Sequence, residues 1–197
     1  MTLLVLVFIV GGVAFWFIGA YNALISLKNQ VSNAWKQIDV QLKRRHDLIP
    51  NLIETVRGAM EFEGDTLEAV VKARNQAISV ERGSASVAQT AAAESQLSGA
   101  LGRLLAVVEA YPTLKATGNT AQLQEELTST ENKISFARQL YNDTATMYNT
   151  KQAQFPTNFV AGMAGASPVE LWEITDVAER AVPRVNLSNK SVDRSRV

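Results

Sequence analysis

The chain has 197 residues, which leaves room for one ordinary domain and an appendage. Its 19 basic residues equal its 19 acidic residues, so no overall field attracts nucleic acid and no nucleic-acid partner is expected. The absence of cysteine excludes disulfides, thiolate nucleophiles and cysteine-ligated zinc sites. Apolar residues are concentrated at one end, because residues 1–27 carry no charged side chain.

Residues 1–27 predict a transmembrane anchor and its exit from the membrane. The run LLVLVFIVGGVAFWFIGA supplies most of the ~20 apolar residues that cross a hydrocarbon core. A cleaved signal peptide is the alternative, but it would need basic residues before the run and a small-x-small cleavage site after it. Neither feature is evident here, so we expect an anchor. Its representative positions, which include aromatic residues suited to the membrane interface, are Leu3, Phe8, Trp16, Ile18 and Tyr21.

The orientation of the anchor follows from its flanking cations. Downstream of the run, and opposed by Asp39, stand five basic residues: Lys28, Lys36, Lys43, Arg44 and Arg45. The positive-inside rule then places the N-terminus outside and the bulk of the chain in the cytoplasm. We therefore expect a single-pass protein of the inner (cytoplasmic) membrane, with membrane lipid as one partner.

The rest of the sequence predicts an all-α fold, in which the membrane helix continues into an antiparallel bundle of about four long helices over residues 28–156. Apolar residues first recur at steps of three and four from Leu24 to Leu42, the stripe of an amphipathic helix. Pro50 removes a backbone donor, so a kink or a helix restart is expected there. Further stripes occupy about 52–82, with a break near Gly64, then 86–108 and 121–155.

Residues 157–197 predict a loop, a short helix and a variable tail. Gly162, Gly165 and Pro168 favour a loop directly after Pro156. The apolar residues beyond them could dock on the bundle or on a partner: Leu171, Trp172 and Ile174.

Four blocks of the chain carry a resemblance: YNALISLKNQVSNAWKQIDVQLKRRHDLIPNLIETVRG, LGRLLAVVEAYPTLKA, LQEELTSTENKISFARQLYND and YNTKQAQFP. Together they resemble the LemA family from Tyr21 to Pro156. The resemblance implies an N-terminal membrane helix with a small exterior end, an antiparallel helical bundle and no established reaction. It leaves the stretch after Pro168 as a part specific to this protein.

Little in the sequence indicates catalysis. His46 is the one histidine, and with Asp47 and Glu54 it could form an acid–base pair, but adjacent residues on a helix do not face each other. A solvated or salt-bridged polar face is the preferred interpretation. We therefore expect a membrane-anchored interaction or scaffold protein that is not an enzyme, with unidentified protein partners and homo-oligomers; an enzyme using polar residues around His46 is the alternative.

Two acidic clusters could hold a hard cation: Glu61, Glu63 and Asp65, and Glu125, Glu126 and Glu131. No EF-hand loop is present, and carboxylates in the first turns of helices follow from the helix dipole, so no metal site and no cofactor are expected. The repeated Tyr-Asn dipeptides and the asparagines of the predicted helices favour amides that fix helix register inside the bundle over a ligand-binding stripe: Asn22, Asn29, Asn33, Asn132, Asn142 and Asn149.

The segment KRRHD-LIPNL predicts an interaction or architectural site. Its cations Lys43, Arg44 and Arg45 precede a proline, and guanidinium groups can bind carboxylates or lipid phosphates in bidentate geometry. Replacing both arginines by alanine is expected to alter assembly or stability. His46→Ala is expected to leave both nearly unchanged.

Overall fold

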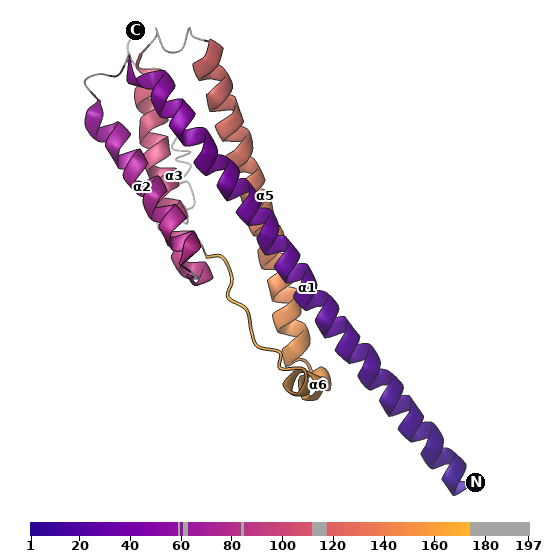
Figure 1. Cartoon of the computed structure of the whole chain (residues 1–197). Coiled ribbons are helices and arrows are strands. Elements are labelled where there is room, and N and C mark those ends of the chain that lie inside the picture. The colour runs from indigo at the N-terminus through magenta and orange to yellow at the C-terminus, as the bar shows by residue number, and fades with distance from the viewer. Residues whose placement is uncertain (59, 61–62, 84, 112–117, 174–197) are drawn as a thin grey trace, which may run out of the picture.

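The computed structural model describes residues 1–58, 60, 63–83, 85–111 and 118–173, and within these ranges it contains five helices and no strand. In chain order they are α1 (Thr2–Arg57), α2 (Gly64–Arg82), α3 (Val87–Glu109), α5 (Gly118–Ala153) and α6 (Thr157–Met163). Helix α1 runs antiparallel along α5, and α2 runs antiparallel along α3 (Figure 1). The all-α prediction is confirmed, and so is the long apolar helix that begins the chain.

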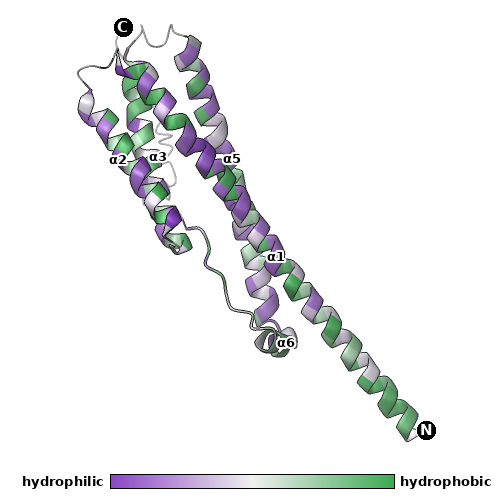
Figure 2. Ribbon diagram, in the orientation of Figure 1, coloured by the Kyte–Doolittle hydropathy of each residue, from purple (hydrophilic) through white to green (hydrophobic). Residues whose placement is uncertain are grey.

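The N-terminal part of α1 projects beyond the rest of the molecule as an apolar rod (Figure 2). Nearly every side chain of residues 2–16 is exposed, including Leu3 and Phe8. Within the described part of the chain, α1 is the one helix long and apolar enough to cross a membrane. The same helix then enters the bundle without interruption, with Leu24 as its first fully buried side chain.

Inside the bundle, α1 and α5 contact each other through residues that recur every seven positions. This repeat keeps one face of a helix against its neighbour over a long distance. In α1 the buried members are Leu24, Val31, Ile38, Arg45 and Leu52, and in α5 they are Thr120, Leu127, Ile134, Tyr141 and Tyr148. One position of the α1 repeat is therefore an arginine.

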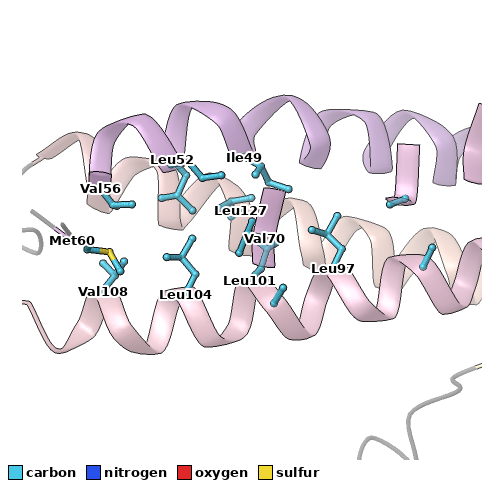
Figure 3. Packing of buried hydrophobic residues seen from close by; sticks show 14 residues of the cluster. Ile49, Leu52, Val56, Met60, Val70, Leu97, Leu101, Leu104, Val108 and Leu127 are labelled. Atoms are coloured by element: carbon cyan, nitrogen blue, oxygen red, sulfur yellow. The ribbon is translucent and has the colours of Figure 1, made fainter. Parts of the chain in front are cut away.

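The core consists of two clusters. The first joins α1, α2, α3 and α5 around Leu52, Leu104 and Leu127 (Figure 3). The second lies between the lower halves of α1 and α5, toward the apolar rod, and includes Val160 of α6 and Trp172. The beginning of α3 reaches this cluster through Val87 and Ala91, and α6 and the segment 166–173 cover the part nearer the apolar rod (Figure 1).

Pro50 does not restart the helix, because α1 continues through it to Arg57. Proline has no amide hydrogen, so the carbonyl of His46, four residues earlier, loses its usual helical donor. Nε of Arg74 in α2 donates to that carbonyl oxygen at 2.7 Å. A side chain from the neighbouring helix thus satisfies the acceptor that the proline leaves unpaired, and it ties α2 to α1.

The loop expected directly after Pro156 is instead the short helix α6, and this prediction was wrong. Its residues Thr157, Val160 and Ala161 are buried against the bundle, and this packing stabilises a helix that its glycine content disfavours. The predicted irregular structure begins at Gly165, whose φ of 60° suits glycine. Residues 166–173 then follow without helix, and Ile174 lies outside the described residues.

Candidate functional site

The residues of the predicted cationic segment lie on two different faces of α1. Lys43 and Arg44 are exposed, whereas Arg45 and His46 are buried. Arg45 is only 1% exposed, since it occupies the seven-residue core repeat of α1 between Ile38 and Leu52. Of the two forms of polar face expected, the salt-bridged one holds for Arg45 and His46, which are buried and paired with carboxylates, and the solvated one holds for Lys43 and Arg44, which are exposed.

Arg45 joins three helices of the bundle. Its Nη2 donates to the carboxylate of Glu94 in α3, and both side chains of this ion pair are buried. Its Nη1 donates to Oε2 of Glu131 in α5 at 2.6 Å and to Oγ of Ser98 in α3 at 2.8 Å. Ser98 in turn donates to Oε1 of Glu131 at 3.3 Å. The guanidinium thus binds two carboxylates inside its own chain, each through one nitrogen, and does not bind a single carboxylate in the bidentate geometry that was expected.

His46 bonds the other oxygen of the same carboxylate. Its Nε2 lies 2.9 Å from Oε1 of Glu94, and its Nδ1 lies 3.8 Å from Oε2 of Glu81 in α2. Because a carboxylate only accepts, the short contact requires a proton on Nε2. Glu54, the partner considered from the sequence, is exposed and does not take part.

Glu94 is the centre of this network and the group whose electrostatics are most affected. Burial by itself would raise its pKa, since the charged form loses water. The hydrogen bond from His46 and the positive charge of Arg45 outweigh burial, and the pKa of Glu94 lies below its ordinary value of 4.5. The carboxylate is therefore stabilised in its ionised form as the acceptor of hydrogen bonds from two buried side chains, Arg45 and His46.

The space beside the network is smaller than an ordinary ligand pocket. A cavity of about 30 Å³ is bordered by Arg45, Glu94, Ser98, Glu131 and Trp172, among others. Such a cavity accommodates water molecules, whereas ligand pockets usually measure ~300–1,000 Å³. The arrangement links α1, α3 and α5, and buried polar groups at core positions of packed helices are known to specify register in other proteins. His46→Ala is expected to lower stability, contrary to the sequence-based prediction, because the substitution removes a hydrogen bond to the buried Glu94 carboxylate.

Sequence reasoning missed Glu94 and Ser98, although a signal for Glu94 is present. Glu94 stands seven residues before Leu101 and fourteen before Val108, and all three are buried. A single carboxylate on an otherwise apolar helix stripe indicates a buried charge that needs a cation opposite it. Extending the α1 repeat of Leu24, Val31 and Ile38 by seven residues would have selected Arg45 as that cation.

The asparagines predicted to join helices serve another purpose. The side-chain amide of Asn142 donates to the carbonyl of Trp172 at 2.9 Å and accepts from its backbone N–H at 2.8 Å. Asn149 forms the same pair of bonds with Val169, at 2.9 and 3.0 Å. The segment 166–173, which we call the strap, is therefore held to α5 through its backbone.

The other asparagines of the prediction are exposed, so the helix-register interpretation is wrong for them: Asn22, Asn29, Asn33 and Asn132. Trp172 anchors the strap by its side chain as well. Its ring lies 5.9 Å from that of Trp35, and the guanidinium of Arg138 lies 5.3 Å from its centre. Docking of Trp172 on the bundle is thus confirmed, whereas Leu171 stays exposed.

Neither acidic cluster brings three potential metal ligands together within the described residues, where no group of at least three histidine, aspartate or glutamate side chains could hold an ion. Glu61 lies outside that part of the chain. Glu131 is paired with Arg45, so its carboxylate already has a cationic partner.

Comparison with known proteins agrees with the resemblance seen in the sequence. The model of the LemA family matches residues 34–187, well over half of the chain. The chain belongs to the LemA family. Because the match continues to residue 187, it includes α6 and the strap, and the expectation that the stretch after Pro168 is specific to this protein was wrong for residues 169–187.

This LemA-family chain is 27% identical to Protein LemA of Metamycoplasma hominis over 175 residues, which are 89% of the chain and 78% of that relative. It is 22% identical to Magnetosome protein MamQ 2 of Paramagnetospirillum magneticum, over 78% of the chain and 64% of the relative. Magnetosome protein MamQ of Magnetospirillum gryphiswaldense is also 22% identical, over 76% of the chain and 63% of the relative. The chain thus spans less than two thirds of the length of these two MamQ proteins.

Proposed function

We propose that this LemA-family protein is a single-pass membrane protein whose helical bundle stands at the membrane surface and binds proteins, including further copies of itself. The observation that carries the proposal is the continuity of α1. One helix provides both an exposed apolar rod and the core of the bundle. An exposed apolar segment of this length is costly in water and favourable in lipid.

The orientation proposed is an outside N-terminus and a cytoplasmic bundle, since Lys28 and Lys36 follow the apolar run on the bundle side and are exposed. Two measurements test the anchor and its orientation. The intact chain is expected to resist carbonate extraction from membranes, while deletion of residues 1–20 releases it. A reporter fused after Pro156 is expected to be active in the cytoplasm; an extracytoplasmic signal contradicts the orientation and leaves the anchor intact.

A groove on the outer face of the α1–α5 pair supports protein binding. It has a volume of about 480 Å³, and Val40, Phe136 and Leu140 are among the apolar side chains that border it. Phe136 is 72% exposed. Lys36 and Lys133 border the same groove, so a helix with apolar and acidic residues suits it.

Chemical crosslinking in native membranes, followed by mass spectrometry, tests the binding role. Phe136→Glu is expected to remove crosslinks that involve this groove, while Arg103→Glu, a charge change on α3, serves as a control. Unchanged crosslinks in Phe136→Glu would exclude this groove as the binding surface.

A catalytic role is the second candidate, because His46 and Glu94 form a hydrogen-bonded pair of the kind that acid–base enzymes use. Against it, both groups are buried beside a cavity of about 30 Å³ and are bonded to neighbouring side chains. We therefore propose that the bundle is not an enzyme. A metabolite turnover that His46→Gln abolishes without loss of folding would reverse this assignment.

A further inference from the structure

Helix α6 lies where α1 leaves the bundle (Figure 1). Its residues Val160 and Ala161 belong to the same buried cluster as Leu24, and Phe17 and Ala20 pack partly buried against that cluster. Phe17 and Ala20 end the apolar run of α1, and the first charge follows at Lys28. If the run crosses a membrane, α6 therefore lies at the level of the membrane boundary.

The outer side of this region carries large apolar side chains with no cover from the described residues. Phe155, Phe159 and Met163 are 80%, 66% and 78% exposed. They recur at intervals of four residues, and the rings of Phe155 and Phe159 meet edge to face with centroids 6.0 Å apart. A small cluster of this kind on a water-facing surface is unfavourable and marks a contact site.

Charge is also absent around this cluster. No aspartate, glutamate, lysine or arginine occurs between Lys151 and Glu170, a stretch that includes all of α6. The uncharged stretch of α1 ends at the same level of the molecule. Two segments far apart in sequence thus carry no charged side chain at the same level of the molecule, which suits contact with the apolar part of a bilayer.

We propose that Phe155, Phe159 and Met163 insert into the lipid interface of the same bilayer that α1 spans, so that α6 is a second membrane contact. This inference rests on the proposed anchor. Phenylalanine and methionine side chains suit the boundary between headgroups and acyl chains, where an interfacial segment buries its apolar face. With two contacts, the bundle is held at a fixed tilt and rotation relative to the membrane, whereas α1 alone would leave rotation about its own axis free.

The absence of cysteine makes the depth of single positions measurable. Three full-length variants, Phe8→Cys, Phe159→Cys and Phe136→Cys, are each labelled with a small fluorophore and reconstituted in vesicles of phosphatidylcholine and phosphatidylglycerol. Lipids that carry a nitroxide near the headgroup or deep in the acyl chain then quench the label. Phe8 reports on the anchor, and Phe136 is a matched exposed phenylalanine of α5, about 25 Å along the helix from its membrane end.

The proposal expects quenching at Phe159 by the shallow nitroxide to exceed that at Phe136 by about twofold or more, as for a residue ~5–10 Å inside the interface. Strong quenching at Phe8 with equal, low quenching at Phe159 and Phe136 overturns this inference and leaves the anchor standing. Low quenching at Phe8 overturns the anchor and this inference with it. If unlabelled Phe159→Cys forms a disulfide between two copies under mild oxidation and the labelled variant is not quenched, a second copy covers α6 and the lipid assignment is wrong.

Discussion

Arg45→Ala is the substitution that most directly tests the buried network. The substitution removes the guanidinium that bonds both Glu94 and Glu131. Glu94 is only 3% exposed, and of the hydrogen bonds described above its carboxylate keeps only the one from His46. Removing one partner of a buried ion pair costs about 3–5 kcal/mol, because the other charge remains buried. This is a large part of the ~5–15 kcal/mol that stabilises an ordinary domain.

For a chain of this size, each 1 kcal/mol lowers the melting temperature by roughly 2–4 °C, so Arg45→Ala is expected to lower it by about 6–20 °C. Thermal unfolding of the full chain in detergent, followed by far-UV circular dichroism, measures the effect. Arg44→Ala is the matched control, since Arg44 is the exposed neighbour and its loss is expected to cost less than about 0.5 kcal/mol.

A double substitution separates the cost of an unpaired charge from the value of the pair itself. Arg45→Met with Glu94→Leu places apolar residues at two core positions of similar volume, and stability is expected to return to near that of the wild type. The reasoning fails if Arg45→Ala melts within about 1 °C of Arg44→Ala. It also fails if the Met–Leu pair is as unstable as Arg45→Ala.

Three further predictions follow from other contacts. Because the pKa of Glu94 is lowered in the folded protein, the ionised carboxylate stabilises the fold above pH 4.5, and this stabilisation is lost as the pH falls through the folded-state pKa. The melting temperature is therefore expected to fall more steeply between about pH 5 and pH 3 for the wild type than for Glu94→Gln. Arg74→Met is expected to lower the free energy of unfolding by about 1–3 kcal/mol, because it leaves the carbonyl of His46 unpaired, and by less in a Pro50→Ala background, where the alanine amide can bond that carbonyl. Equal losses in both backgrounds, measured by denaturant unfolding, would contradict this account. Asn142→Ala is expected to speed hydrogen exchange at the Trp172 amide about tenfold by removing two hydrogen bonds, and unchanged exchange measured by mass spectrometry would show that the strap is held by its side chains alone.

Helix content and the membrane candidate could be predicted from local sequence. The uncharged run before Lys28 and the apolar stripe from Leu24 to Leu42 depend on composition and on the period of the helix, which neighbouring residues set without tertiary contacts. The approximate ends of α2, α3 and α5 were predictable for the same reason, from glycine, proline and serine at their boundaries.

The sequence repeats could indicate that Glu94 and Arg45 are buried, but not the geometry by which polar side chains meet. The pairing of Arg45 with Glu94 joins residues 49 positions apart, and the bond from Arg74 to the His46 carbonyl joins two helices. Pro50 was therefore expected to kink or restart the helix, since a sequence pattern records the missing donor but not the side chain that replaces it.

The C-terminal part of the described chain shows the same division. Its glycines and Pro168 predicted irregular structure, and this holds for the strap but not for α6, which burial of Val160 and Ala161 against α1 and α5 stabilises. The seven-residue repeats by themselves determined which faces of α1 and α5 pack together. Tertiary structure decided which charges were enclosed with them and what covers the second cluster, because both depend on free energies of burial and pairing that arise only when distant segments meet.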